Sequence, residues 1–238
     1  GILHGDFGTS SSTGRPVWDE IANKLPATVE LALAAMLISL IIAIPVGILS
    51  AVKQYSIMDS ICMLGAMLGV SMPNFWLGLL LILVFSVNFG WFSVYGRGEI
   101  TQLILPALTL GTGIAAVTAR LTRSSILEIF KQDYIRTARS KGLAERAVIN
   151  RHALKNALIP VVTGVGLQFG SLLEGAVVVE VIFAWPGLGR LLYDSIFARD
   201  FAVIQGCVFF IAVMYVIVNL LIDIIYVWLD PRIRYEAK

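Results

Sequence analysis

Four acidic side chains occur within long apolar stretches of this sequence, and these residues most need a chemical explanation. An ionisable group inside such a stretch is costly, so it usually marks a function. Glu30 and Glu180 fall near the ends of their stretches, which favours placement at an interface. Asp223 lies about two helical turns before Asp230, and we expect it to pair with a basic residue or with a neighbouring helix.

The fourth acid, Glu174, lies deepest in its apolar stretch and shares a helical face with three small or polar residues, Gly164, Gln168 and Ser171. One interpretation is that this stripe lines a water-filled translocation path. The other is that it makes hydrogen bonds between packed helices. The sequence leaves both interpretations open.

Groups that would carry out bond chemistry are missing from the pattern. The two histidines, His4 and His152, are expected at opposite faces of a membrane, which excludes a His-based metal cluster or catalytic triad. No Gly-x-x-x-x-Gly-Lys-Ser/Thr phosphate loop occurs. Cys62 and Cys207 lie in apolar segments, as small core residues do. We therefore predict that the chain is not an enzyme and holds no cofactor or metal.

The composition indicates an all-α, polytopic membrane protein. Hydrophobic residues make up 58% of the chain and charged residues only 14%, whereas soluble domains carry about 25% charged residues. Helices suit this setting because an unpaired strand edge does not survive in lipid. Five segments are long enough to cross a hydrocarbon core about 30 Å thick: 27–52, 60–88 (with Pro73 inside it), 103–119, 157–182 and 203–228.

The distribution of basic residues orients these segments. Loops 53–59, 120–156 and 229–238 carry 13 Lys and Arg residues, and the opposite set carries 5. The richer set is therefore expected in the cytoplasm. This places 1–26 outside the cytoplasm, a transmembrane domain at 27–228 that contains the loop 120–156, and a cytoplasmic tail at 229–238. An odd number of spans with an outer N-terminus predicts that a preceding first helix of six is missing.

Half of the chain's eighteen Lys and Arg residues lie in the loop 120–156, against three acids. We expect 120–140 to continue the third span as a helix and Gly142 to break it. A separate short basic helix should follow at 144–156, with Arg151 and Lys155 on one face. One interpretation is a topological anchor on anionic lipid headgroups; the other is a docking surface for a partner.

The stretch DYIRTARSKGLAERAVINRHALKNALIPVV resembles the coupling loop of inner-membrane permeases of ATP-binding-cassette importers, in the dipeptide, oligopeptide and nickel branch. The segments VSMPNFWLGLLLILVFSV, VIFAWPGLGRLLYDSIFARDFAVIQG and LDPRIR agree with the same branch, in the same order. The family motif Glu-Ala-Ala followed by Gly corresponds here to Arg136, Thr137, Ala138 and Gly142. The acidic first position is therefore replaced, and only the second Ala and the Gly match.

This resemblance implies a type I importer permease in a bacterial or archaeal cytoplasmic membrane, with its C-terminus in the cytoplasm. Its implied partners are a second permease subunit in a heterodimer, two ATPase subunits that hydrolyse the ATP, an extracytoplasmic substrate-binding protein and membrane lipid, but no nucleic acid. The ATPase-coupling residues that it implies are Ala138, Lys141, Gly142, Leu143, Arg146, Arg151, His152 and Lys155.

The implied function is ATP-driven import of peptides or a related small solute, with the chain forming part of the path. Dipeptides, oligopeptides, glutathione and nickel complexes all suit the branch, and the two poorly placed histidines favour peptides over nickel. The alternative is a proton-coupled secondary transporter that uses Glu174 or Asp223 as a relay. A membrane scaffold without transport is a third class.

Overall fold

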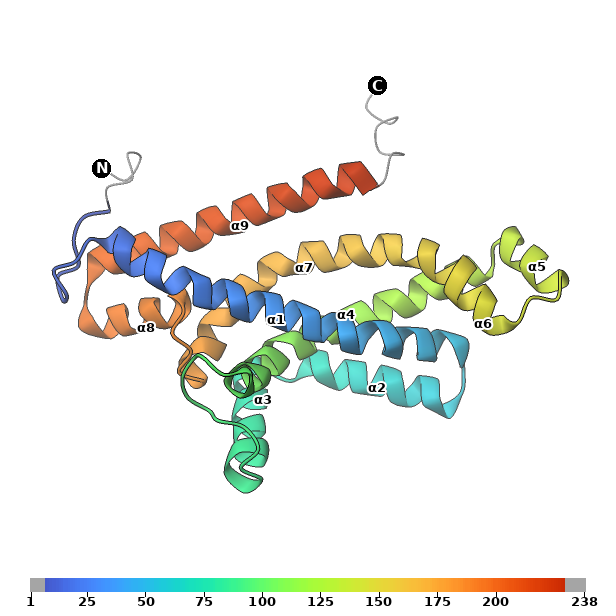
Figure 1. The fold of residues 1–238 in the computed structure, drawn as a ribbon, viewed down its shortest axis with the longest axis horizontal. Coiled ribbons are helices and arrows are strands. Elements are labelled where there is room, and N and C mark those ends of the chain that lie inside the picture. The colour runs from blue at the N-terminus through green and yellow to red at the C-terminus, as the bar shows by residue number, and fades with distance from the viewer. Residues whose placement is uncertain (1–6, 230–238) are drawn as a thin grey trace. The chain divides into compact units, whose positions relative to one another are not determined.

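The computed structural model describes residues 7–229, and it leaves out the side chains of 171, 173, 174, 223 and 225–229. In this part of the chain the regular structure is helical apart from one isolated bridge between Thr9 and Pro16. Figure 1 traces the helices. They are α1 (Val17–Val52), α2 (Ile57–Ser71), α3 (Asn74–Leu81), α4 (Ile100–Phe130), α5 (Asp133–Ser140), α6 (Glu145–Ala147), α7 (Leu154–Ile182), α8 (Leu188–Ala198) and α9 (Phe201–Leu229), with π-helical turns at Ile82–Asn88 and Val148–Ala153.

Three of the described helices, α1, α4 and α9, are each long and apolar enough to cross a membrane, and the number rises to five if each of two bent helix pairs is counted as one span. The prediction of an all-helical membrane fold is therefore confirmed. Helix α1 begins at Val17, ten residues before the expected span. The second span is not one helix, because Pro73 starts α3 and Met72 leaves the helical conformation. A residue before proline is disfavoured in an α-helix.

The chain divides into two compact units. The first contains residues 1–38, 72–111 and 169–219, and the second contains 39–71, 112–168 and 220–238. The long helices α1, α4, α7 and α9 each contribute residues to both units.

In the first unit, Asp200 fastens the start of α9 to the N-terminal segment. Its carboxylate accepts hydrogen bonds from the hydroxyl of Ser10 at 2.5 Å and from the backbone N–H of Val203 at 3.3 Å. Ser12 donates both its hydroxyl and its backbone N–H to the same carboxylate. Burial raises the pKa of Asp200, but these donors outweigh burial and hold the pKa below its ordinary value. The carboxylate therefore stays ionised and caps α9.

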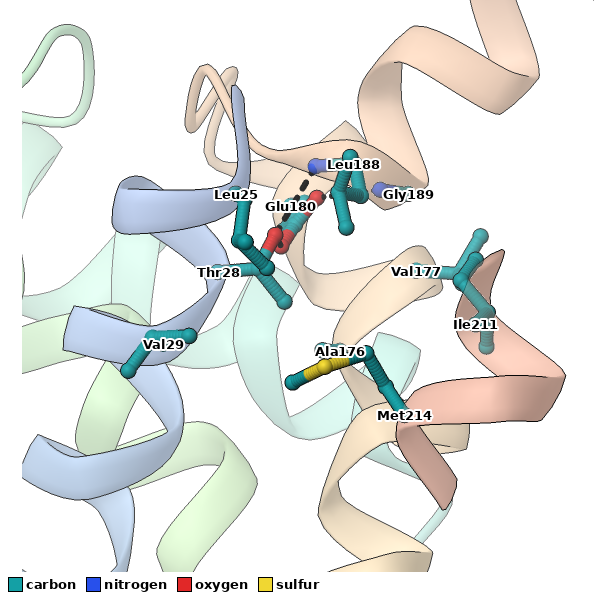
Figure 2. Close-up of a pocket in the computed structure, with 10 residues that line it drawn as sticks. All are labelled: Leu25, Thr28, Val29, Ala176, Val177, Glu180, Leu188, Gly189, Ile211 and Met214. Carbon is teal, nitrogen blue, oxygen red and sulfur yellow. Dashed lines mark hydrogen bonds between the residues drawn. The ribbon is translucent and has the colours of Figure 1, made fainter. Parts of the chain in front are cut away.

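Glu180, near the end of α7, is fully buried in the first unit. Glu180 lies two residues before the end of α7, in keeping with its place in the sequence, but the sequence did not predict that protein covers it. Its carboxylate accepts hydrogen bonds from the hydroxyl of Thr28 on α1 at 2.6 Å and from the backbone N–H groups of Gly189 and Arg190 at 2.7 and 3.1 Å. Thr28 accepts in turn from the backbone N–H of Leu188 at 2.8 Å (Figure 2). Three of the N–H groups that open α8 are thus satisfied from α1 and α7.

The tight turn before α8 leaves no room for a side chain at Gly187. A Cβ atom there would clash with both carboxylate oxygens of Glu180. Trp185, on the other side of this turn, is buried and donates its indole N–H to the carbonyl of Ala27 at 2.7 Å. The short sequence Trp-Pro-Gly-Leu-Gly is therefore an internal joint between α1, α7 and α8.

In the second unit, α2 folds back along the second half of α1, and both contact α4 through small residues (Figure 1). A Cβ on Gly47 of α1 would lie 2.5 Å from the Cβ of Thr122 and 2.7 Å from the carbonyl of Ala119. A Cβ on Gly69 of α2 would lie 3.2 Å from the Cβ of Ala116. Small residues allow helix backbones to approach closely in a membrane, so α4 is the central helix of this unit.

We predict that Gly187→Ala lowers the stability of the detergent-solubilised protein by about 2 kcal/mol, because overpacking of this kind costs about 1–3 kcal/mol. The measurement is the midpoint of thermal unfolding. Gly65→Ala is the matched control, because a Cβ at Gly65 meets nothing within 4 Å and Ala favours a helix more than Gly does. Equal midpoints for the two variants would contradict a crowded joint at Gly187.

Candidate functional site

The loop predicted at 120–156 is built differently from the expectation. Helix α4 ends at Phe130, and the chain turns at Lys131 and Gln132 before α5 begins at Asp133. The expected continuous helix to residue 140 is therefore wrong. Its break lacks a Gly or Pro signal, and Gln132 has an extended backbone (ψ 145°). We call residues 131–153, which connect α4 to α7, the docking segment.

Gly142 ends α5, as predicted, with a positive φ of 74°. Its backbone N–H donates to the carbonyl of Arg139 at 2.9 Å, and the N–H of Leu143 donates to the carbonyl of Ala138. This left-handed conformation favours glycine. The basic helix expected at 144–156 is not separate, because α6 and the π-helical turn at Val148–Ala153 lead directly into α7. Nothing in that sequence breaks the helix.

The docking segment has its own small apolar core. Ile135 and Ala138 on α5 are buried against Val148 and Ala153, and Ile129 and Phe130 pack on the same cluster from the end of α4. This core gives the segment a defined shape, because α5 packs against the helical turn that leads into α7 and is not surrounded by solvent.

One arginine clamps the turn that contains Gly142. Arg139 donates from Nη2 and Nε to the two carboxylate oxygens of Glu145, at 2.5 and 3.1 Å. Its guanidinium also lies 5.1 Å from the ring centroid of Phe130. The hydrogen bonds to Glu145 raise the pKa of Arg139 above its ordinary value. The clamp therefore stays charged and links α4, α5 and α6.

Most of the predicted coupling residues lie on the surface of the docking segment, and two do not. Ala138 is buried in the apolar core and His152 is partly buried. Leu143, next to Gly142, is 42% exposed although it is apolar. The remaining exposed members are Lys141, Gly142, Arg146 and Arg151 in the docking segment, and Lys155 just beyond it at the start of α7. The segment thus presents a basic surface with one apolar side chain at its turn.

The residues predicted to line a path are only partly described. A Cβ on Gly164 would clash with Leu121 of α4, so this glycine serves close helix packing. Gln168 donates to the hydroxyl of Thr118 and to the carbonyl of Gly164, both at 3.3 Å. These contacts favour the helix-packing interpretation for Gly164 and Gln168. The side chains of Ser171, Glu174 and Asp223 lie outside the described residues.

Sequence reasoning missed two pairs of charged residues. Arg139 pairs with Glu145 across Gly142, and Arg123 on α4 pairs with Asp59 on α2. The first pair was detectable, because an Arg and a Glu flank a helix-ending glycine. The second joins residues 64 positions apart, and no local pattern marks it. Glu30 is also paired, with Arg97 at 2.6 Å. Among the described residues, no group of three or more His, Cys, Asp or Glu could hold a metal ion.

The fold matches that of solved ATP-binding-cassette transporters. A chain of the MetNI methionine ABC transporter superposes with a TM-score of 0.75 at 18% identity, over 89% of this chain and 96% of that one. A chain of an amino acid ABC transporter superposes with a TM-score of 0.67 at 18% identity, over 87% of this chain and 93% of that one. The chain therefore shares the helical fold of chains from one class of membrane protein, the ATP-binding-cassette transporters.

The sequence identifies the family within this class. Residues 43–235 match the family described as binding-protein-dependent transport system inner membrane component, and the chain belongs to it. The dipeptide transport system permease protein DppB of Escherichia coli K12 is 44% identical over an alignment 267 residues long. This alignment covers 99% of this chain and 79% of that protein. The glutathione transport system permease protein GsiC of Salmonella choleraesuis is 46% identical over 235 residues, covering 99% and 77%.

The chain is therefore an inner-membrane, multi-pass permease subunit of an ATP-binding-cassette importer, and not an enzyme. This membership decides against the proton-coupled secondary transporter and the scaffold. The resemblance stated from the sequence is confirmed.

We predict that Arg139→Gln speeds hydrogen–deuterium exchange of the amides at 141–145 several-fold and leaves the unfolding midpoint almost unchanged. Exposed ion pairs and cation–π contacts each contribute at most about 1 kcal/mol, so the effect is local. Arg136→Gln is the control, because Arg136 pairs with Asp133 at 3.5 Å with both side chains largely exposed. Equal exchange in the two variants would show that Arg139 does not hold the turn.

Proposed function

We propose that this chain forms, with a second and different permease, the translocation path of a peptide importer, and that its docking segment binds a separate ATPase subunit. A soluble or lipid-anchored binding protein delivers the substrate on the opposite side. Two ATPase subunits hydrolyse ATP and switch the path between inward-facing and outward-facing states. The family description supports dependence on a binding protein.

Peptides are the proposed substrate class. Support comes from two relatives, which are named as permeases for a dipeptide and for glutathione, itself a short peptide. Both match nearly the whole of this chain at 44–46% identity. Identification of the ligand of the cognate binding protein tests this assignment directly: a bound short peptide supports it, and a bound nickel complex or sugar contradicts it.

The basic loops and the C-terminal tail are proposed to face the cytoplasm. The charge asymmetry between the two sets of loops supports this orientation. The exposed cations of the docking segment then face the compartment that contains ATP. Labelling of single cysteines in the tail and in 183–202, from each side of membrane vesicles, tests the orientation.

The observation that carries the docking role is the construction of the turn at Gly142. The turn is held from beneath by an apolar core and from the side by the clamp of Arg139. Its outer surface exposes Lys141, Gly142 and Leu143. A lipid anchor needs only positive charge, whereas a defined turn with an exposed leucine suits a protein groove. Arg146, Arg151 and Lys155 add positive charge around it.

Copurification tests the partners. The tagged chain, expressed with its genomic neighbours, should bring down an ATPase and a second permease. In proteoliposomes, peptide transport should require ATP on the side of the membrane that the docking segment faces. Transport should continue after the proton gradient is collapsed. Isolation of the chain as a transport-competent homodimer would contradict the heterodimer.

We predict that Gly142→Trp reduces ATP-dependent transport at least tenfold while membrane insertion is retained. A Cβ at Gly142 meets nothing within 4 Å in this chain, so a bulky side chain projects outward into the proposed ATPase contact. Gly142→Ala is the matched control, because it brings the same left-handed strain of about 1–2 kcal/mol without the bulk. The measurement is transport and ATPase activity of the reconstituted complex. Similar transport by the two variants would contradict docking at this turn.

A further inference from the structure

A partly buried ion pair joins α2 to α4 in the second unit. Arg123 donates from Nε to one carboxylate oxygen of Asp59 at 2.9 Å and from Nη2 to the other at 2.8 Å. The side chain of Asp59 is only 7% exposed and that of Arg123 is 23% exposed. The same carboxylate accepts hydrogen bonds from the hydroxyl of Ser50 and from the backbone N–H of Tyr55 at 2.9 Å. One carboxylate thus ties the end of α1, the following turn and the start of α2 to α4.

The pair supplies orientation that apolar contacts do not supply. Burial of an ion pair contributes little net stability, because desolvation offsets the attraction between the charges. Lipid tails are as apolar as the helix surfaces, so apolar burial alone does not drive one helix against another in a membrane. A bidentate Arg–Asp ion pair, with two parallel hydrogen bonds, instead fixes one geometry. The hairpin of α1 and α2 is therefore held against α4 in a single register.

The pair also lies close to the docking segment along α4. Arg123 is about two helical turns before Phe130, where α4 ends and where the ring of Phe130 supports Arg139. Between them, Ile126 is buried against Ala51 at the end of α1. Contacts therefore run without interruption from the docking segment through α4 to the hairpin, all within the second unit.

We infer that Asp59 and Arg123 are positioning residues that carry displacement of the docking segment into the hairpin formed by 39–71. The inference rests on the proposed docking of an ATPase at this segment. The docking segment continues directly into α7, so α7 follows its movement through the backbone. The hairpin has no such continuity with the segment, and it follows only through its contacts with α4, which are the close packing at Gly47 and Gly69 and the ion pair. A closely packed unit with a fixed ion pair shifts as one body.

The test compares Arg123→Gln with Arg120→Gln in the reconstituted complex of both permeases and the ATPase. Arg120 lies one turn earlier on the same helix and is exposed, so the control removes the same charge from the same region. We expect Arg123→Gln to raise the ATP hydrolysed per peptide transported at least fivefold, and Arg120→Gln to leave this ratio unchanged. A purely structural defect lowers both rates in proportion and does not move the ratio.

Two further variants keep the inference falsifiable if Arg123→Gln fails to assemble. Arg123→Lys and Asp59→Glu retain the charges and lose the paired geometry, and we expect an intermediate rise in the same ratio. The double variant Asp59→Asn, Arg123→Gln should be no worse than either single change. An unchanged ratio in assembled complexes overturns the inference. If Gly142→Trp also leaves ATP-dependent transport unchanged, the docking role itself is overturned. The two failures are therefore distinguishable.

Discussion

A chain that crosses a membrane must satisfy its backbone polar groups from within the protein, and here buried carboxylates do so where helices begin. Glu180 accepts the N–H groups of Gly189 and Arg190 in the first turn of α8, and Asp200 accepts an N–H group in the first turn of α9. Asp59 accepts the N–H of Tyr55 in the turn that leads to α2. Each carboxylate also accepts a hydrogen bond from a side chain in a distant segment. The same carboxylate therefore caps a helix or turn and joins two segments.

Two ion pairs of the second unit differ in how much they contribute to stability. An exposed ion pair such as Arg139 with Glu145 contributes about 0.2–1 kcal/mol, so it orders the turn locally and adds little to the stability of the whole fold. Removal of one partner from a buried pair costs about 3–5 kcal/mol, because the other charge stays buried and uncompensated. Asp59, at 7% exposure, is close to the second kind, but Arg123 is 23% exposed and therefore lowers this cost.

Much of the fold was predictable, because hydropathy reports directly on what lipid accepts. Each of the five expected spans corresponds to a helix or a broken helix pair. Gly142 was predictable as a helix end, because glycine readily adopts the positive φ that the turn requires. The break at Lys131 and Gln132 was not, since neither residue is a helix breaker and the packing of α5 on Val148 and Ala153 decides it. The burial of Glu180 against Thr28 was not predictable either, because proximity to a helix end does not reveal a covering helix.

By itself, the sequence determined the membrane setting, the helical class, the family and the loop at which a partner is proposed to bind. These depend on composition, on local conformational preference and on motifs that are contiguous along the chain. Only the tertiary structure decided which charged residues are paired and which glycines lie where two helices pack closely. Asp59 meets Arg123 and Thr28 meets Glu180 across 64 and 152 residues. The physical reason is that a hydrogen bond depends on distance in space, and only the packed helices bring those donors and acceptors together.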